Sequence, residues 1–286
     1  MFEMLVNPKK AERYPWELFF VGAFYASLSI LLVEVVFSRD AVLAKYAGLL
    51  IVTFTVMFSM PFIYYTIKYE ESKIPYVRGT FNLLREHEKA IKAFIFLFLG
   101  FVVAFSFWYI LLDSPQNFKA QIETYCLINR PSNVNTCAEQ YGIKNSVVGT
   151  GSVTSSAGRL FQIFKNNCSV LIFTLVFSLI FGAGVIFILA WNASVIAAAI
   201  GIFTKFKLID LPLGLARYMI HGIPEIGAYF IVALAGGMIS VAIIKHEAGQ
   251  ERFWEVLHDS FNLIVAAVIV LFIAALMEVY VTPLLF

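Results

Sequence analysis

His221 and Glu225 are the residues whose types and spacing could support chemistry, and they lie in the sequence His-Gly-Ile-Pro-Glu. On a continuous helix, side chains four residues apart share a face. Pro224 lacks a backbone donor and clashes with the carbonyl four residues earlier, and Gly222 allows close backbone approach. The sequence therefore predicts a broken or kinked helix carrying an ionisable pair. In a membrane segment, such a pair marks a functional site by default.

Three roles are open for this predicted break. The two side chains could form a structural hydrogen bond across it, line a pore or proton path, or belong to a metal or catalytic centre. Two ligands are too few for a zinc site, and the zinc-protease pattern with a second histidine is absent. The sequence also has no nucleophile elbow, no Cys-x-x-Cys pair and no phosphate-cradling glycine loop. We therefore predict no metal, no cofactor and no enzymatic activity.

The composition indicates an integral membrane protein. Of the 286 residues, 60% are hydrophobic and 14% are charged, against about 45–50% and about 25% in globular domains. The apolar residues are concentrated in long uncharged runs, as lipid requires. The formal net charge of +2 gives no bulk attraction to nucleic acid.

Seven hydrophobic segments can be recognised, because roughly 20 apolar residues in a helix cross the hydrocarbon core. They are 18–37, 46–67, 93–112, 168–190, 194–206, 212–244 and 260–283. The uncharged run 166–204 is too long for one crossing, so we predict a hairpin turning at Trp191 and Asn192. Its shorter return could instead be re-entrant. The predicted fold is an all-α, polytopic transmembrane helical bundle.

The distribution of Lys and Arg predicts the orientation. The N-terminal three-span region, 1–112, contains the loop 68–92 with six basic residues, and three more precede the first span. Both segments should be cytoplasmic, so the segment 113–165 is extracytoplasmic. With seven spans the C-terminus lies outside, whereas a re-entrant return would reverse everything after it. The loop 68–92 could be a surface helix on the membrane, a docking helix or a solvated connector.

The segment 113–165 is polar and contains Cys126 and Cys137. Two cysteines in an oxidising compartment are expected to pair, and closing this loop would contribute about 3 kcal/mol on a chain-entropy estimate. The alternative is two free thiols. We predict a small extracytoplasmic loop subdomain here, followed by a membrane domain at 166–286.

Polar residues near the predicted span ends indicate where helices are capped and where the membrane interface lies. Asn166, Asn167 and Asn192 could cap helices, and Glu34 and Glu278 are expected at the outer interface. Small residues gather in the last spans, where they favour either ordinary intramolecular packing or a homo-oligomer interface. They are Gly182, Gly184, Ala197, Ala198, Ala199, Gly201, Ala233, Ala235, Gly236 and Gly237.

Several of these features together resemble the stage II sporulation protein M family. The resemblance covers about 160–286 and rests on the paired asparagines, the glycine-containing helix, Asn192, the His-Gly-x-x-Glu box and the small-residue helix after it. Ala193 departs from the family, where glycine commonly follows the asparagine. The N-terminal part, including Asn7-Pro8-Lys9-Lys10-Ala11-Glu12, is similar to an archaeal branch of the family.

The resemblance implies an assembly role. The bacterial relatives belong to a membrane complex that remodels the cell wall during forespore engulfment, and the hydrolytic activity resides in their partner proteins. It therefore implies a non-enzymatic scaffold in the cell membrane, in contact with lipid and unidentified protein partners but not with nucleic acid. The alternative is a channel or transporter lined by His221 and Glu225.

Overall fold

The computed structural model describes residues 13–37, 39–40, 42–73, 80–130, 133–143, 155–181, 185–244 and 251–286. The longer helices are α2 (Glu17–Leu32), α3 (Ala47–Lys73), α4 (Thr80–Leu112), α7 (Ser156–Phe181), α8 (Val185–Phe203), α9 (Leu211–Ile244) and α10 (Glu251–Leu276). The shorter ones are η2 (Val33–Phe37), η3 (Leu43–Tyr46), η5 (Pro115–Phe118), α5 (Lys119–Asn129), α6 (Val134–Gln140), η7 (Leu208–Asp210), η8 (Met277–Val281) and α11 (Thr282–Leu285). The described residues contain no strand, which confirms the all-α prediction.

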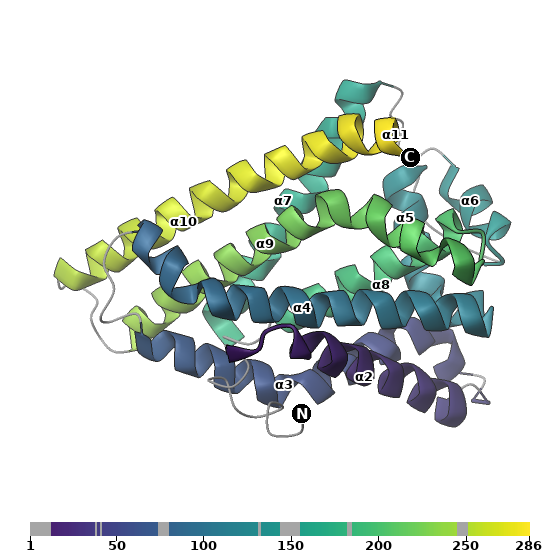
Figure 1. Cartoon of the computed structure of the whole chain (residues 1–286), viewed down its shortest axis with the longest axis horizontal. Coiled ribbons are helices and arrows are strands. Elements are labelled where there is room, and N and C mark those ends of the chain that lie inside the picture. The colour runs from purple at the N-terminus through teal and green to yellow at the C-terminus, as the bar shows by residue number, and fades with distance from the viewer. Residues whose placement is uncertain are drawn as a thin grey trace.

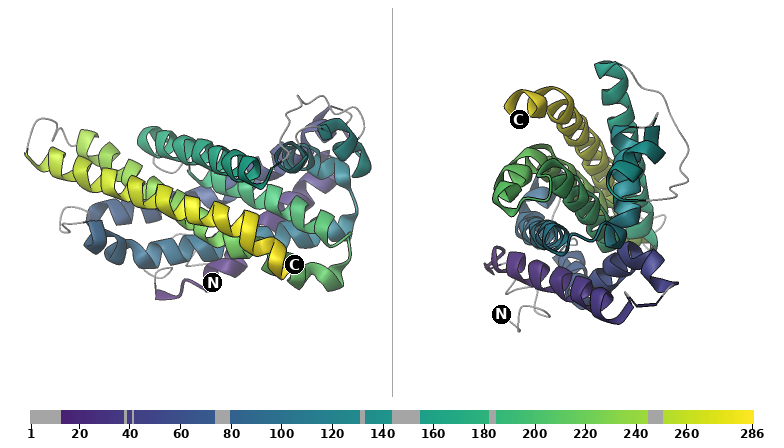
Figure 2. Two further views of the ribbon diagram at one scale, coloured as in Figure 1. Left: turned by 90° about the horizontal axis from the view of Figure 1, so that it is seen from above. Right: turned by 90° about the vertical axis from the view of Figure 1, so that its right-hand side faces the viewer.

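Within the part of the chain that the structure describes, seven helical segments are long and apolar enough to cross a membrane. They are Glu17–Phe37, Leu43–Ile63, Glu88–Leu112, Ser156–Leu179, Ile186–Phe203, Leu208–Ser240 and Phe253–Leu285. The predicted number of hydrophobic segments is therefore confirmed. The helices run along the long axis of the molecule and form one bundle (Figures 1 and 2).

The predicted position of the helical hairpin was wrong. Helix α7 ends at Phe181 and α8 begins at Val185, so the chain reverses about eight residues before Trp191. Asn192 lies inside α8, where its side-chain amide donates to the carbonyl of Ile188 at 2.8 Å. An asparagine bonded to its own helix in this way need not end it. At 19 residues, α8 is about 28 Å long, which favours a full crossing over a re-entrant loop.

The loop 68–92 is not a separate surface helix in this structure. Helix α3 continues to Lys73, and α4 runs unbroken from Thr80 into the third span. Residues 74–79 lie outside the described part of the chain. The charged segment at the start of α4 is therefore a direct extension of a membrane helix.

The two ends of the bundle differ. The end of α3 and the start of α4 lie at one end of the bundle, as do the end of α9 and the start of α10, whereas α5, α6 and the C-terminus lie at the other (Figure 1). We call η5, α5 and α6 the cap, and the end that carries them the cap end. This alternation of junctions is the one that seven crossings produce.

Helices α2 and α4 pack with their backbones in contact near Gly22 and Gly100. A Cβ atom added to Gly22 would lie 2.2 Å from the carbonyl oxygen of Leu97, and one added to Gly100 would lie 2.2 Å from that of Phe19. Small residues allow this kind of approach between membrane helices. The same two helices are joined by a hydrogen bond, in which the Trp108 indole of α4 donates to the Ser27 hydroxyl of α2.

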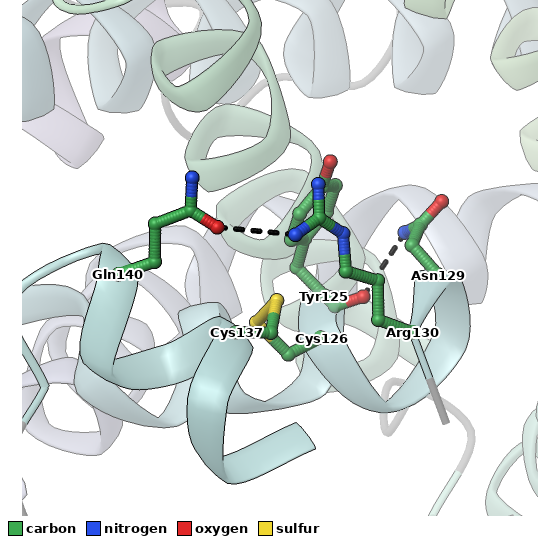
Figure 3. Close-up of a disulfide and its surroundings, with 6 residues drawn as sticks. All are labelled: Tyr125, Cys126, Asn129, Arg130, Cys137 and Gln140. Carbon is green, nitrogen blue, oxygen red and sulfur yellow. Dashed lines mark hydrogen bonds between the residues drawn. A yellow bond between two sulfur atoms is a disulfide. The ribbon is translucent and has the colours of Figure 1, made fainter. Parts of the chain in front are cut away.

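The cap is closed by the predicted disulfide between Cys126 and Cys137, whose Cα atoms are 5.8 Å apart. Figure 3 shows this bond between α5 and α6. Beside it, the Arg130 guanidinium donates to Gln140 at 3.0 Å. The small subdomain is therefore held together covalently and by a polar contact between its two helices.

Buried polar contacts fasten the cap to the membrane helices. Gln121 of α5 is fully buried, and its side-chain amide donates to the carbonyl of Gly48 in α3 at 3.0 Å and to the hydroxyl of Ser194 in α8 at 3.2 Å. Asn117, just before α5, donates to Glu34 at 2.5 Å. The cap is thus anchored to three different spans. Through this contact Glu34 lies at the cap end.

Candidate functional site

The candidate site is built around the first half of α9. The predicted break is not present, because α9 is continuous from Leu211 to Ile244 with Pro224 inside it. A proline removes only one backbone hydrogen bond, and packing of α9 against α7, α8 and α10 supports the helix through that position. Gly222 is also helical, and a Cβ added to it would meet only ordinary van der Waals contacts.

His221 is buried and contacts the last turn of the chain. Its Nδ1 lies 3.2 Å from the hydroxyl of Thr282. That hydroxyl donates its own proton to the carbonyl of Met277 at 3.1 Å. The contact is consequently favourable when His221 carries a proton on Nδ1 and donates to Thr282. It ties α9 to the C-terminal helical segment.

Glu225 has a different partner, on α7. Its carboxylate accepts a hydrogen bond of 2.6 Å from the side-chain amide of Asn167. The amide of Asn166 in turn lies 3.4 Å from the side-chain oxygen of Asn167. Both asparagines were expected at a helix end, but α7 begins at Ser156, so they lie well inside it. Asn167 therefore serves as an interhelical partner rather than a cap.

The structure thus separates the pair that the sequence placed together. His221 is bonded to Thr282 and Glu225 to Asn167, and no hydrogen bond joins His221 to Glu225 in the described part of the chain. Their shared helical face allowed the interaction, but neighbouring helices supplied other partners. The motif acts as two separate interhelical contacts, one to the C-terminal segment and one to α7.

A cavity of about 170 Å³ opens beside His221 at the cap end. Its walls come from the end of α5, the first turns of α7 and α9, and the segment η8–α11. The polar side chains along it are Asn129, Arg159, Gln162, Arg217, Tyr218, His221, Glu278 and Thr282. Glu225 does not line it. His221 and Glu225 therefore do not face one common pathway in this structure.

The charged side chains around the cavity are Arg159, Arg217 and Glu278. Arg217 is half-buried, and its guanidinium lies 4.8 Å from the ring centre of Phe203 and 6.0 Å from that of Phe286. Arg159 is exposed and interacts electrostatically with Glu278. The two arginines and Glu278 leave a net positive charge when all three are ionised.

Tyr125 of the cap lies close to Tyr218 in the wall of the cavity. Tyr125 lies outside the membrane-spanning segments, and burial raises the pKa of its phenol. The side chain is therefore neutral across the physiological pH range, and this contact does not change with pH there.

The sequence did not single out Arg159 or Arg217. A usable signal was present for Arg217, which precedes His221 by four residues and so shares its helical face. Glu278 and Thr282 are likewise four residues apart in the last segment. Arg159 offered no comparable signal, because its proximity to Glu278 depends on how α7 packs against η8.

The site offers hydrogen bonding and charge rather than a recognisable metal centre. Within the described residues there is no group of three or more His, Cys, Asp or Glu side chains that could hold a metal ion. The donors of the cavity suit a polar or anionic ligand.

Comparison with known proteins identifies the family. The family model described as stage II sporulation protein M matches residues 93–283, about two thirds of the chain. The match begins well before residue 160 and so includes the membrane-spanning part of α4 from residue 93, the cap and every residue of the cavity. No curated protein and no solved structure matches the chain. The chain is an integral membrane protein that belongs to the stage II sporulation protein M family.

Proposed function

We propose that this protein is a non-enzymatic membrane scaffold that holds a partner protein at the outer face of the cell membrane. The observation that carries the proposal is the construction of the cap. A disulfide closes it, and side-chain hydrogen bonds fasten it to three spans. A loop that merely connects two spans does not require such anchoring, whereas a platform that transmits a docking force to the membrane does.

The exposed surface of the cap would carry the partner. Glu139 and Gln140 are exposed on α6, on a helix whose other side is buried against α5. Family membership adds support, since the relatives known from bacterial sporulation act within a membrane complex. The proposal assigns the recognition surface to the cap and a supporting role to the seven spans.

A photo-crosslinking amino acid at Glu139 tests the scaffold. In cells that naturally express the chain, we expect it to form a discrete adduct with one protein, because the cap surface is the docking face. The same crosslinker at Ile269, 56% exposed in the middle of α10, is the lipid-facing control and should give no such adduct. Absence of a protein adduct from the cap, together with ion flux in liposomes that His221→Ala abolishes, would instead favour a channel.

We propose further that the N-terminus is cytoplasmic and that the cap and the C-terminus are outside. The basic loop between the second and third spans supports this orientation by the positive-inside rule. A disulfide in the cap also suits an oxidising compartment.

Single-cysteine labelling tests the orientation. In a background lacking the free thiol of Cys168, cysteines replacing Glu139 or Leu285 should react with a membrane-impermeant reagent on intact cells. A cysteine replacing Glu251, exposed at the start of α10, should react only after permeabilisation. Labelling of position 251 from outside would reverse the assignment of the last spans.

A further inference from the structure

We propose that the cavity at the cap end binds the phosphate group of an anionic membrane-lipid headgroup. The structure places two guanidinium groups, Arg159 and Arg217, on the wall of one cavity, beside the amides of Gln162 and Asn129. This inference is independent of the scaffold proposal, because it concerns lipid bound between helices and not a protein on the cap.

The chemistry of the two arginines favours phosphate. A guanidinium presents planar, paired donors that match the oxygens of a phosphate. Arg217 is held in place by its two aromatic neighbours, so its donors are oriented before a ligand arrives. Within the described residues, the Arg159 guanidinium has no hydrogen-bond partner. Its electrostatic attraction to Glu278 leaves its donors available to a ligand in the cavity.

The position of the cavity favours a lipid over a soluble anion. Arg159 is only three residues from the start of α7 and Arg217 only six from the start of α9, so both lie near the membrane boundary, where headgroups are found. The apolar residues Ile128, Ile163 and Pro283 complete the wall and can contact the glycerol and the first methylenes.

Glu278 sets the expected selectivity. Its carboxylate lines the same cavity, where it can accept hydrogen bonds from headgroup hydroxyls. It also repels a second negative charge. A singly charged phosphodiester with hydroxyl groups, such as phosphatidylglycerol, fits this arrangement better than a polyphosphate. A volume of about 170 Å³ exceeds the roughly 10–15 Å³ that a single water needs, so a headgroup fragment can enter.

Native mass spectrometry of the full chain in detergent tests the proposal. Phosphatidylglycerol should bind at one saturable site, more tightly than phosphatidylcholine. The substitution Arg159→Gln should weaken that binding about tenfold, the effect of losing one charge-assisted contact. Because Arg159 is exposed, the variant should keep the wild-type unfolding midpoint. The matched control is Lys165→Gln, an equal charge change at an exposed position on the same helix outside the cavity, which should bind as the wild type does.

Inorganic phosphate at millimolar concentration distinguishes the two sources of the ligand. If it binds in an Arg159-dependent manner and phosphatidylglycerol does not, the site takes a soluble phosphate and the lipid assignment is wrong. Equal phosphatidylglycerol binding by the wild type and Arg159→Gln, or an equal loss in Lys165→Gln, would overturn the site altogether. The proposal also fails if neither ligand binds the wild type.

Discussion

Replacing Gly22 or Gly100 with alanine is expected to destabilise the protein by about 3 kcal/mol, near the upper end of the usual cost of overpacking. Each new Cβ would lie 2.2 Å from a backbone carbonyl oxygen of the facing helix. A flexible side chain could rotate away from such a contact, but a helix backbone can relieve it only if α2 and α4 separate. Thermal unfolding in detergent should therefore show a clearly lower midpoint for either variant.

Gly227→Ala and Gly237→Ala are the matched controls. Both glycines are helical, and a Cβ at either position would have nothing within 4 Å. Because alanine is the better helix former by about 1 kcal/mol, these variants should be neutral or slightly stabilised. Unchanged midpoints in all four variants would mean that α2 and α4 do not approach as closely as in this structure.

Asn167 and Glu225 are expected to show a coupling free energy of about 1 kcal/mol in a double-mutant cycle, within the range found for hydrogen bonds between membrane helices. The cycle compares Asn167→Ala, Glu225→Ala and the double variant. Each single change leaves the other polar group without its partner, whereas the double change removes both groups. The unfolding free energy of each variant, measured by denaturant titration in detergent, yields the coupling.

The cycle between His221 and Glu225 is the internal control. The two side chains are four residues apart, but they bond to different helical segments. Their coupling should stay below about 0.5 kcal/mol, the usual limit for independent sites. A larger coupling for this pair than for Asn167 and Glu225 would show that the pairing inferred from the sequence was correct after all.

Much of the architecture could be predicted because lipid offers no hydrogen-bond partners to the backbone. Every backbone group within the hydrocarbon needs an internal partner, so long apolar runs must become helices. Counting such runs identified seven segments. The pairing of Cys126 with Cys137 was also predictable. The two cysteines are close in sequence and lie in a polar segment that is expected in an oxidising compartment, where cysteines pair.

The turn between α7 and α8 shows where this reasoning was insufficient. Uniform hydrophobicity over 166–204 carried no information about where the chain reverses, so the turn was assigned to Trp191 and Asn192. The pair Gly182 and Gly184 was the better signal, because glycine is weak in a helix interior. Small residues also suit close packing between membrane helices, so the pair did not by itself mark a turn.

By itself, the sequence determined the class of protein, the number of helices long and apolar enough to span a membrane, and the residues that are costly to place in one. Only the tertiary structure decided their partners. Glu225 bonds to Asn167, 58 residues away in the chain, and His221 to Thr282, 61 residues away. Hydrophobicity is a local property of each segment and can be read along the chain. Which polar groups meet depends on the rotation and depth of each helix, and these are set by packing between segments that are distant in sequence.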